Sequence, residues 1–189
     1  MSVDVTAIEF QTIDHWDESL WQKVEKVYYE AFPEQGRKTK EIIRKILTRR
    51  LGVLHVAIWQ SEVIGMALTG ELKQANALLV DYLAVLQDLR NQGVGQRFLG
   101  YLKEWATSTR QLVGIIIEIE ADTTPANFNR MQFWKHCGFV LTPYIHTYIW
   151  VPEPYQAMYL NIHPNATIPS NGEALFRHIH QFHRKAYKK

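Results

Sequence analysis

A short glycine-containing loop, Arg90-Asn91-Gln92-Gly93-Val94-Gly95, carries the clearest chemical signal in the chain. It separates an apolar stretch, 77–86, from a segment in which apolar residues recur at helical spacing. Glycine leaves backbone N–H groups uncovered, and the first N–H groups of a helix have no partner within it. Together with the helix dipole, such groups stabilise a phosphate or pyrophosphate. A tight strand-to-helix turn that needs glycine for steric reasons would explain the same residues.

Two common phosphate-binding loops do not fit this segment. No Gly-Lys-Ser/Thr follows, so a P-loop is excluded. A dinucleotide-binding fingerprint requires glycine where the chain has Phe98. The loop therefore predicts a phosphate site of another kind.

Two carboxylates interrupt an otherwise apolar segment, 114–120. Glu118 and Glu120 share one face of the expected strand because side chains alternate. A carboxylate is a suitable proton acceptor for an amine nucleophile, which is protonated in neutral water. Asp81 and Glu71 are weaker candidates. Simple solvation at a strand end is the alternative explanation.

Cysteine and histidine give no recognisable metal site. Cys137 is the single cysteine, which excludes an intramolecular disulfide and favours a reducing, intracellular compartment. His136 and His146 lack ligand spacing, and 178–183 reads as a packed surface helix whose apolar stripe separates its histidines. We expect no metal.

Helical and strand periodicities alternate along the chain. Strands are expected at 8–13, 54–59, 63–72, 77–86, 114–120 and 144–151, and helices at 20–31, 39–50, 94–108, 124–137 and from 170 onward. The strand-helix-strand unit 77–120 predicts a parallel pair with a right-handed crossover, beside an antiparallel meander. The fold class is thus α/β (α+β), with a mixed, mostly antiparallel sheet flanked by helices.

The last part of the chain differs in composition. Four of the seven prolines follow residue 151, so 152–171 reads as irregular, before a helix capped by Ser170 with Glu173. We therefore expect a domain over 1–151 and an extension over 152–189. The five basic residues of 177–189 have no acidic neighbour, and without them the chain carries 16 basic against 19 acidic residues.

Composition bounds the function classes. A net charge of +2 argues against a dedicated nucleic-acid binder, and 47% hydrophobic residues supply one sizeable core. Neither a signal peptide nor a long apolar span is visible, so we expect a soluble, cytoplasmic protein without membrane or nucleic-acid partners.

Two motifs resemble the GNAT family of N-acetyltransferases across roughly residues 5–151. Tyr82-Leu83-Ala84-Val85, followed at Arg90 by the glycine loop, is similar to the family's acetyl-CoA signature. Asn127 with Phe133 and Gly138-Phe139 resembles its second motif. The resemblance implies the acyl-CoA N-acyltransferase fold and acetyl-CoA as co-substrate. It also implies direct attack of a primary amine, in a small molecule or peptide, within a ternary complex.

The resemblance also assigns residues. Glu118 occupies the position of a family glutamate, and Glu120 and Tyr144 complete the catalytic candidates. The expected acetyl-CoA contacts are Leu83, Ala84 and Val85 for the pantetheine and thioester; Arg90, Asn91, Gln92, Gly93, Val94, Gly95 and Gln96 for the pyrophosphate; and Asn127 and Trp134 beside the arm. Capping of its helix is an alternative role for Asn127.

One departure concerns the leaving group. Many members place a tyrosine near the CoA sulfur, where this chain has Trp134, whose indole is not an ordinary acid. Tyr144, Tyr148 or Tyr82 could take its place. A non-catalytic acyl-CoA-binding or regulatory module is therefore the main alternative. An interaction protein whose basic tail meets an acidic partner is a third class, and a homodimer is possible.

The acceptor is less well defined. In this fold the first two helices and their loop form one wall of the acceptor site, and 34–50 holds seven basic residues. They favour an acceptor with a carboxylate or phosphate, or else form a solvated helix face.

Overall fold

The structure is a computed structural model that describes residues 2–149 and 151–188. The chain forms two compact units. Unit 1 comprises Met1–Gly70, Val80–Trp105 and Ala186–Lys189, and unit 2 comprises Glu71–Leu79 and Ala106–Lys185. Strands β3 and β4 and helices α3 and α5 each contribute residues to both units.

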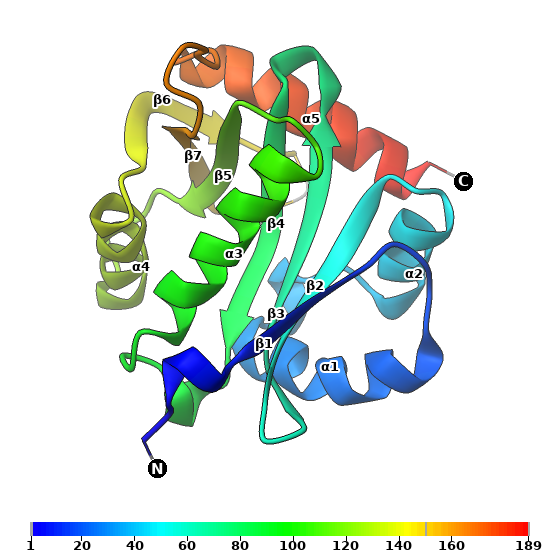
Figure 1. Cartoon of the computed structure of the whole chain (residues 1–189). Coiled ribbons are helices and arrows are strands. Elements are labelled where there is room, and N and C mark those ends of the chain that lie inside the picture. The colour runs from blue at the N-terminus through cyan, green and yellow to red at the C-terminus, as the bar shows by residue number, and fades with distance from the viewer. Residues whose placement is uncertain (1, 150, 189) are drawn as a thin grey trace. The chain divides into compact units, whose positions relative to one another are not determined.

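Seven strands and five α-helices are described (Figure 1). The strands are β1 (Glu9–Ile13), β2 (Gly52–Trp59), β3 (Glu62–Leu72), β4 (Ala77–Val85), β5 (Gly114–Glu120), β6 (Val140–Thr147) and β7 (Pro154–Asn161). The helices are α1 (Glu18–Ala31), α2 (Lys40–Thr48), α3 (Val94–Ser108), α4 (Pro125–His136) and α5 (Gly172–Tyr187). The hydrogen-bonded strand order is β1-β2-β3-β4-β5-β7-β6. Because β4 and β5 are parallel while β1–β2, β2–β3, β5–β7 and β6–β7 are antiparallel, the predicted mixed fold class is confirmed.

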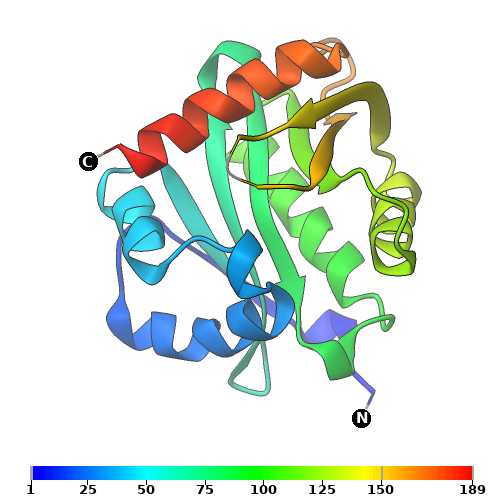
Figure 2. The same ribbon diagram turned by 180° about the vertical axis from the view of Figure 1, so that it is seen from behind.

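Unit 1 is built on the β1–β2–β3 meander. Gln60 and Ser61 both adopt positive φ, 51° and 66°, as a two-residue hairpin turn requires. Figures 1 and 2 show α3 on one face of these strands and α1 and α2 on the other. Asp17 caps α1 by accepting a hydrogen bond from the Leu20 N–H, and α2 buries Ile43 and its apolar neighbours.

A buried histidine ties three strands of unit 1 to α3. His55 Nδ1 lies 2.7 Å from the Thr12 hydroxyl, and its Nε2 lies 2.8 Å from the Thr69 hydroxyl. Thr12 in turn lies 2.6 Å from the Tyr101 hydroxyl on α3, and the Trp105 ring packs edge-on against the imidazole. Since buried polar groups are stable only when hydrogen-bonded, this network fixes α3 on β1–β3.

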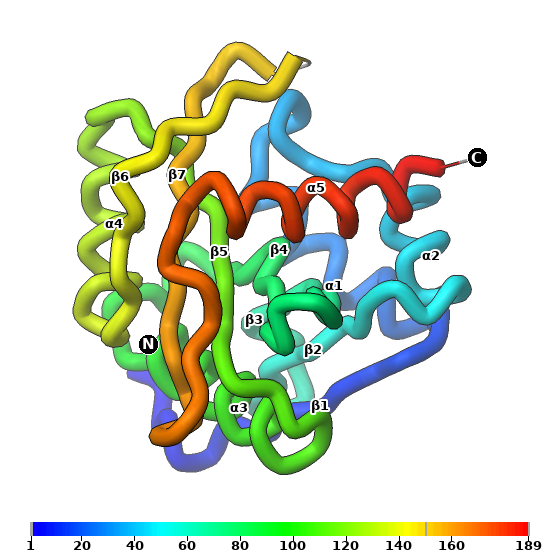
Figure 3. Tube along the Cα trace, turned by 90° about the horizontal axis from the view of Figure 1, so that it is seen from above, coloured from blue at the N-terminus to red at the C-terminus, as the bar shows by residue number. Residues whose placement is uncertain are grey.

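Unit 2 contains a strand that the sequence analysis missed. The segment 152–171, predicted to be irregular, holds β7, which pairs with β5 from Gly114–Asn161 to Glu120–Tyr155 and with β6 on its other edge (Figure 3). The prolines suggested a loop, but Pro152 precedes the strand and Pro154 is its first residue, where no ladder bond is lost.

Two further boundaries differ from the prediction. The strand expected at 144–151 is β6, Val140–Thr147, and Trp150 lies outside the described residues. β6 accommodates Pro143 in a register irregularity between Leu141 and Ile145.

The cap of α5 also differs. Asn171, not Ser170, accepts from the Ala174 N–H at 3.1 Å, so the helix begins at Gly172. Lys189, at the end of the basic tail, lies outside the described residues. Among the described helices, none has the length and apolar character needed to cross a membrane.

Candidate active site

The glycine loop, Arg90–Gly95, has the backbone geometry of an anion site. Asn91 and Gly93 both lie in the left-handed region, with φ of 60° and 84°. The Arg97 N–H donates to the Gly93 carbonyl at 3.0 Å, which starts the hydrogen-bond ladder of α3. The N–H groups of 94–96 precede that bond and have no acceptor within the helix. Left-handed residues in a loop, together with unpaired N–H groups at the start of a helix, form a concave anion site.

The side chains of the loop hold it in place. Gln92 accepts from the Val3 N–H at 2.9 Å and donates to the Asp88 carbonyl at 3.2 Å. Arg90 Nε donates to the Val85 carbonyl at the end of β4, 2.9 Å away. The loop is thus fixed by its own side chains.

The pairing of β4 stops before the residues expected to hold the pantetheine. Its parallel register with β5 covers Ala77–Leu79 opposite Gly114–Ile116, whereas β4 continues to Val85. Leu83, Ala84 and Val85 therefore follow the part of β4 that is registered with β5.

Glu118 and Glu120, predicted together, have different environments. One Glu118 oxygen lies 2.8 Å from His183 Nε2, and the other accepts from the Tyr148 hydroxyl at 2.5 Å. The Glu118 side chain is 14% exposed, whereas Glu120 is 30% exposed and lies 3.7 Å from Arg130. Glu118 is the better-defined acid–base group.

One histidine of α5, His183, contacts this carboxylate and another, His180, lies beside it on the same face, contrary to the sequence interpretation. The prediction separated them by an apolar stripe, but Phe176, His180 and His183, four and three residues apart, share one face. His180 Nε2 lies 2.8 Å from His146 Nε2, and the Tyr148 ring contacts both imidazoles. The helical spacing of these three residues could be seen in the sequence. The strand that their side chains meet could not.

The His146–His180 pair predicts acid-sensitive stability. Burial lowers the pKa of both imidazoles below the ordinary value of 6.5, although the nearby Glu118 partly offsets this. A lowered pKa favours the neutral form in the folded state, so this stabilisation is complete above pH 6.5 and decreases as the pH falls below it. Urea unfolding at pH 7.5 and 5.5 should show a smaller loss in H146F/H180L than in wild type. The exposed control H136Q should retain the wild-type loss, and equal losses in all three proteins would contradict the assignment.

The other predicted site residues have structural partners. Thr124, not Asn127, caps α4, and the buried Asn127 amide donates to Asp122. Trp134 is buried, edge-on to Phe133 and Phe139. Tyr144 is partly exposed near the Phe176 ring.

The tyrosines considered as acids also differ. Burial is the main cause that raises the pKa of Tyr82, and its hydroxyl accepts from the Lys38 N–H at 2.9 Å. Tyr148 donates to Glu118. Neither tyrosine is a ready proton donor for a thiolate, so Tyr144 is the best remaining candidate.

A buried ion pair lies beneath the expected acceptor wall in unit 1. Lys38 Nζ lies 2.9 and 2.8 Å from the two Asp81 oxygens, and the two side chains are 5% and 3% exposed. The Tyr28 hydroxyl donates to the Lys38 carbonyl. The centroid of the Tyr82 ring lies 4.9 Å from Lys38 Nζ. The weaker base candidate Asp81 therefore holds the segment between α1 and α2.

Other basic residues of 34–50 have partners as well. Lys40 pairs with Glu18, and the Arg37 guanidinium lies 4.6 Å from the Tyr29 ring centroid. Arg49 donates to the Lys188 carbonyl at 2.7 Å.

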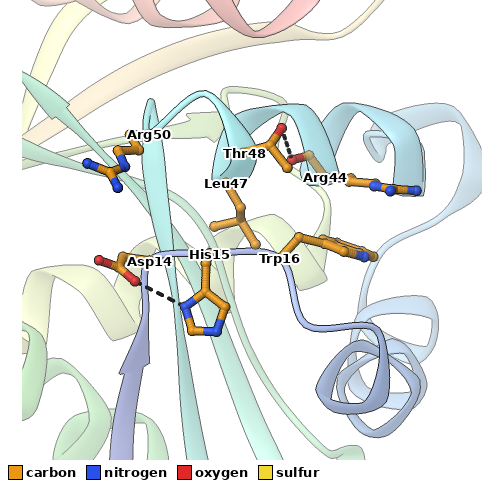
Figure 4. Close-up of a pocket in the computed structure, with 7 residues that line it drawn as sticks. All are labelled: Asp14, His15, Trp16, Arg44, Leu47, Thr48 and Arg50. Carbon is orange, nitrogen blue, oxygen red and sulfur yellow. Dashed lines mark hydrogen bonds and ion pairs between the residues drawn. The ribbon is translucent and has the colours of Figure 1, made fainter.

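Arg44 and Arg50 line an open pocket of about 430 Å³ with Asp14, His15, Trp16, Leu47 and Thr48 (Figure 4). This pocket lies at the end of β1 and α2. β1 ends opposite Leu54, near the start of β2, and the pocket lies at that end of the strands. Ala84, near the end of β4 that leads into the glycine loop, lies beside Gly65, near the start of β3 and thus at the opposite end. The pocket is therefore separate from the loop.

Comparisons with known proteins agree with this architecture. The chain matches the family model of the Acetyltransferase (GNAT) family over residues 15–139. A solved structure assigned to that family, from Bacteroides thetaiotaomicron, has a TM-score of 0.71 at 23% identity and covers 96% of this chain and 99% of its own.

Two further solved structures share the fold. The ribosomal-protein-S18-alanine N-acetyltransferase of Escherichia coli has a TM-score of 0.61 at 14% identity, covering 85% of this chain and 99% of its own. An aminoglycoside 6′-N-acetyltransferase complexed with coenzyme A has a TM-score of 0.66 at 15% identity, covering 84% and 99%. A search of curated proteins finds no match.

The family match spans well over half of the chain and includes the glycine loop, β4 and β5. The chain therefore belongs to the GNAT acetyltransferase family and is an acetyl-CoA-dependent acyltransferase.

Proposed function

We propose that this protein transfers an acetyl group from acetyl-CoA to a primary amine by direct attack within a ternary complex. The observation that carries the proposal is the glycine loop, whose left-handed Asn91 and Gly93 lie between β4 and the start of α3. In this account the N–H groups of Asn91 to Gln96 hold the pyrophosphate, with Arg90 beside it.

The end of β4 would hold the rest of the cofactor. Backbone groups of Leu83, Ala84 and Val85 bind the pantetheine and thioester. A backbone N–H near Leu83 then donates to the oxyanion that forms as nitrogen attacks the carbonyl. Asn127 and the buried Trp134 shape the wall beside the arm, and Tyr144 is the candidate to protonate the CoA thiolate.

Glu118 is the proposed centre of proton removal. Its carboxylate is largely buried and fixed by hydrogen bonds to His183 and Tyr148, whereas the Glu120 side chain is more exposed. The acceptor class is a primary amine in a small molecule or at a peptide N-terminus or lysine. Structural neighbours named for acting on aminoglycosides, spermidine and a ribosomal protein support that range.

The experiment has two steps. Acetyl-CoA should raise the melting temperature of the protein, because a ligand that binds the folded state stabilises it. Free thiol should then appear when polyamines, aminoglycosides or alanine-starting peptides are supplied. No stabilisation at millimolar acetyl-CoA would contradict the proposal and its alternative alike. Stabilisation without thiol release for any amine would favour a non-catalytic acyl-CoA-binding or regulatory module.

Gly93→Val should weaken acetyl-CoA binding by about 10- to 100-fold, because a β-branched side chain disfavours the left-handed conformation. A Cβ at Gly93 would meet only Val5 within 4 Å, at 3.7 Å, so the effect comes from backbone conformation rather than from a clash. Isothermal titration calorimetry measures the change. Gly100→Val on α3, where a Cβ would meet nothing within 4 Å, is the control and should bind normally. Equal affinities for Gly93→Val and wild type would show that the phosphates bind elsewhere.

A further inference from the structure

We propose that the proton leaving the amine is held at His183 Nδ1 and that Glu118 is the positioning residue that orients this imidazole. The inference rests on the proposed acetyltransferase function and deepens it, since it moves the proton acceptor from β5 to a residue of α5. His183 belongs to a segment beyond the family match, which ends at residue 139.

Both carboxylate oxygens of Glu118 accept hydrogen bonds from neighbouring side chains. One of its oxygens is occupied by His183 Nε2 at 2.8 Å and the other by the Tyr148 hydroxyl at 2.5 Å. A carboxylate with both oxygens already engaged is a poor direct acceptor for a further proton. It is well suited to fix the ring orientation and tautomer of a histidine.

The other ring nitrogen of His183, Nδ1, is the proposed proton acceptor. With Nε2–H donating to Glu118, Nδ1 carries the lone pair of the neutral imidazole. This atom is buried and has no hydrogen-bond partner among the described residues. The His183 side chain is 12% exposed, so its position is set by packing as well as by Glu118. A buried, unpartnered acceptor requires an explanation, and a base awaiting its proton donor provides one.

The chemistry balances without another reactant. The amine nitrogen forms the C–N bond to the acetyl carbon, the C–S bond breaks, and CoA leaves as thiolate with the electron pair of that bond. The nitrogen loses its proton to Nδ1, and the resulting imidazolium is stabilised by Glu118. The proton then passes to water or replaces the proton that Tyr144 gives to the CoA thiolate, and either transfer restores the neutral ring.

The surroundings of His183 in unit 2 define the electrostatics of this step. The ionisable groups of unit 2 that interact with it are Glu118 on β5, Tyr148 after β6 and His180 on α5. Burial lowers the pKa of His146 and His180, which keeps them neutral at physiological pH. Glu118 is then the anion in direct contact with His183.

The decisive variant is His183→Gln. Glutamine can still donate an N–H to Glu118 from the position of Nε2 but cannot take up a proton. We expect kcat to fall by about 10²-fold, with an unchanged KM for acetyl-CoA and loss of the imidazole limb of the pH–rate profile. His178→Gln makes the same change on the same helix and should keep the wild-type rate and profile.

The outcomes separate this inference from the proposed function. If His183→Gln keeps kcat within about threefold of wild type and keeps its pH profile, His183 only packs against Glu118 and the inference is overturned. If wild type itself releases no thiol with any amine, the proposed function fails and the catalytic role of His183 fails with it.

A second measurement does not depend on activity or on the folding of a variant. Nitrogen-15 NMR of wild type at neutral pH should show His183 protonated at Nε2 and bare at Nδ1. The opposite tautomer would overturn the inference, because Nδ1 would then have no lone pair to offer.

Discussion

Glu118→Gln is expected to lower kcat for acetyl transfer by about 10²-fold, the same loss as His183→Gln, because the two residues act as one proton-accepting unit. Glutamine keeps the shape of the side chain but removes the charge that stabilises the His183 imidazolium. The KM for acetyl-CoA should stay close to wild type, because Glu118 lies on β5 and not in the glycine loop. Steady-state thiol release with saturating amine measures both constants.

Two matched variants make this prediction specific. Glu120→Gln changes the neighbouring carboxylate, which is half-exposed and paired with Arg130, and should cost far less. Glu173→Gln removes an exposed carboxylate from α5 that pairs with Arg177 and should leave the rate unchanged. A large loss of kcat in Glu120→Gln with a normal rate in Glu118→Gln would show that Glu120, and not Glu118, takes part in the chemistry.

The largest expected effect on stability concerns the buried Lys38–Asp81 pair of unit 1. Asp81→Leu leaves a nearly buried ammonium without its anion, and Lys38→Met leaves the carboxylate without its cation. Each single substitution should lower the free energy of unfolding by about 3–5 kcal/mol. Replacing both partners by apolar residues of similar size removes the uncompensated charge, so Lys38→Met/Asp81→Leu should recover most of that loss.

Urea unfolding of wild type, both single variants and the double variant tests this cycle. The exposed Lys40–Glu18 pair, treated in the same way, provides the control and should change stability by less than about 1 kcal/mol. Additive losses in the double variant would show that Lys38 and Asp81 do not stabilise each other.

The pair also has a functional consequence. Tyr28 and Tyr82 form hydrogen bonds with the backbone of Lys38, and Asp81 binds its side chain. Together these contacts fix the segment between α1 and α2. In the proposed function this segment is part of one wall of the acceptor site.

Much of this architecture was predictable because local patterns decided it. Residues 114–120 form a short, mostly apolar run, as the residues of a buried strand do. The structure places β5, Gly114–Glu120, over the same residues. Gly138 follows the end of α4 by a capping rule that depends on short-range backbone geometry, and it adopts a φ of 92°; Thr39 is the residue before α2, although its side chain makes no capping hydrogen bond. The positive φ at Gly93 follows from the same kind of local requirement.

The missed features depend on contacts between distant segments. Strand β7 was overlooked because Pro152 and Pro154 suggested a loop, whereas the edges of β5 and β6 stabilise the strand. Likewise, His183 lies 65 residues from Glu118 in the sequence, and no local pattern indicates that the two meet.

The most direct test of the account is a crystal structure of the protein with acetyl-CoA and an unreactive analogue of an acceptor amine. The pyrophosphate should lie on the N–H groups of Asn91–Gln96 and the thioester along Leu83–Val85. The acceptor nitrogen should lie within hydrogen-bond reach of His183 Nδ1. A pyrophosphate bound away from the glycine loop, or an acceptor nitrogen remote from both His183 and Glu118, would contradict the account.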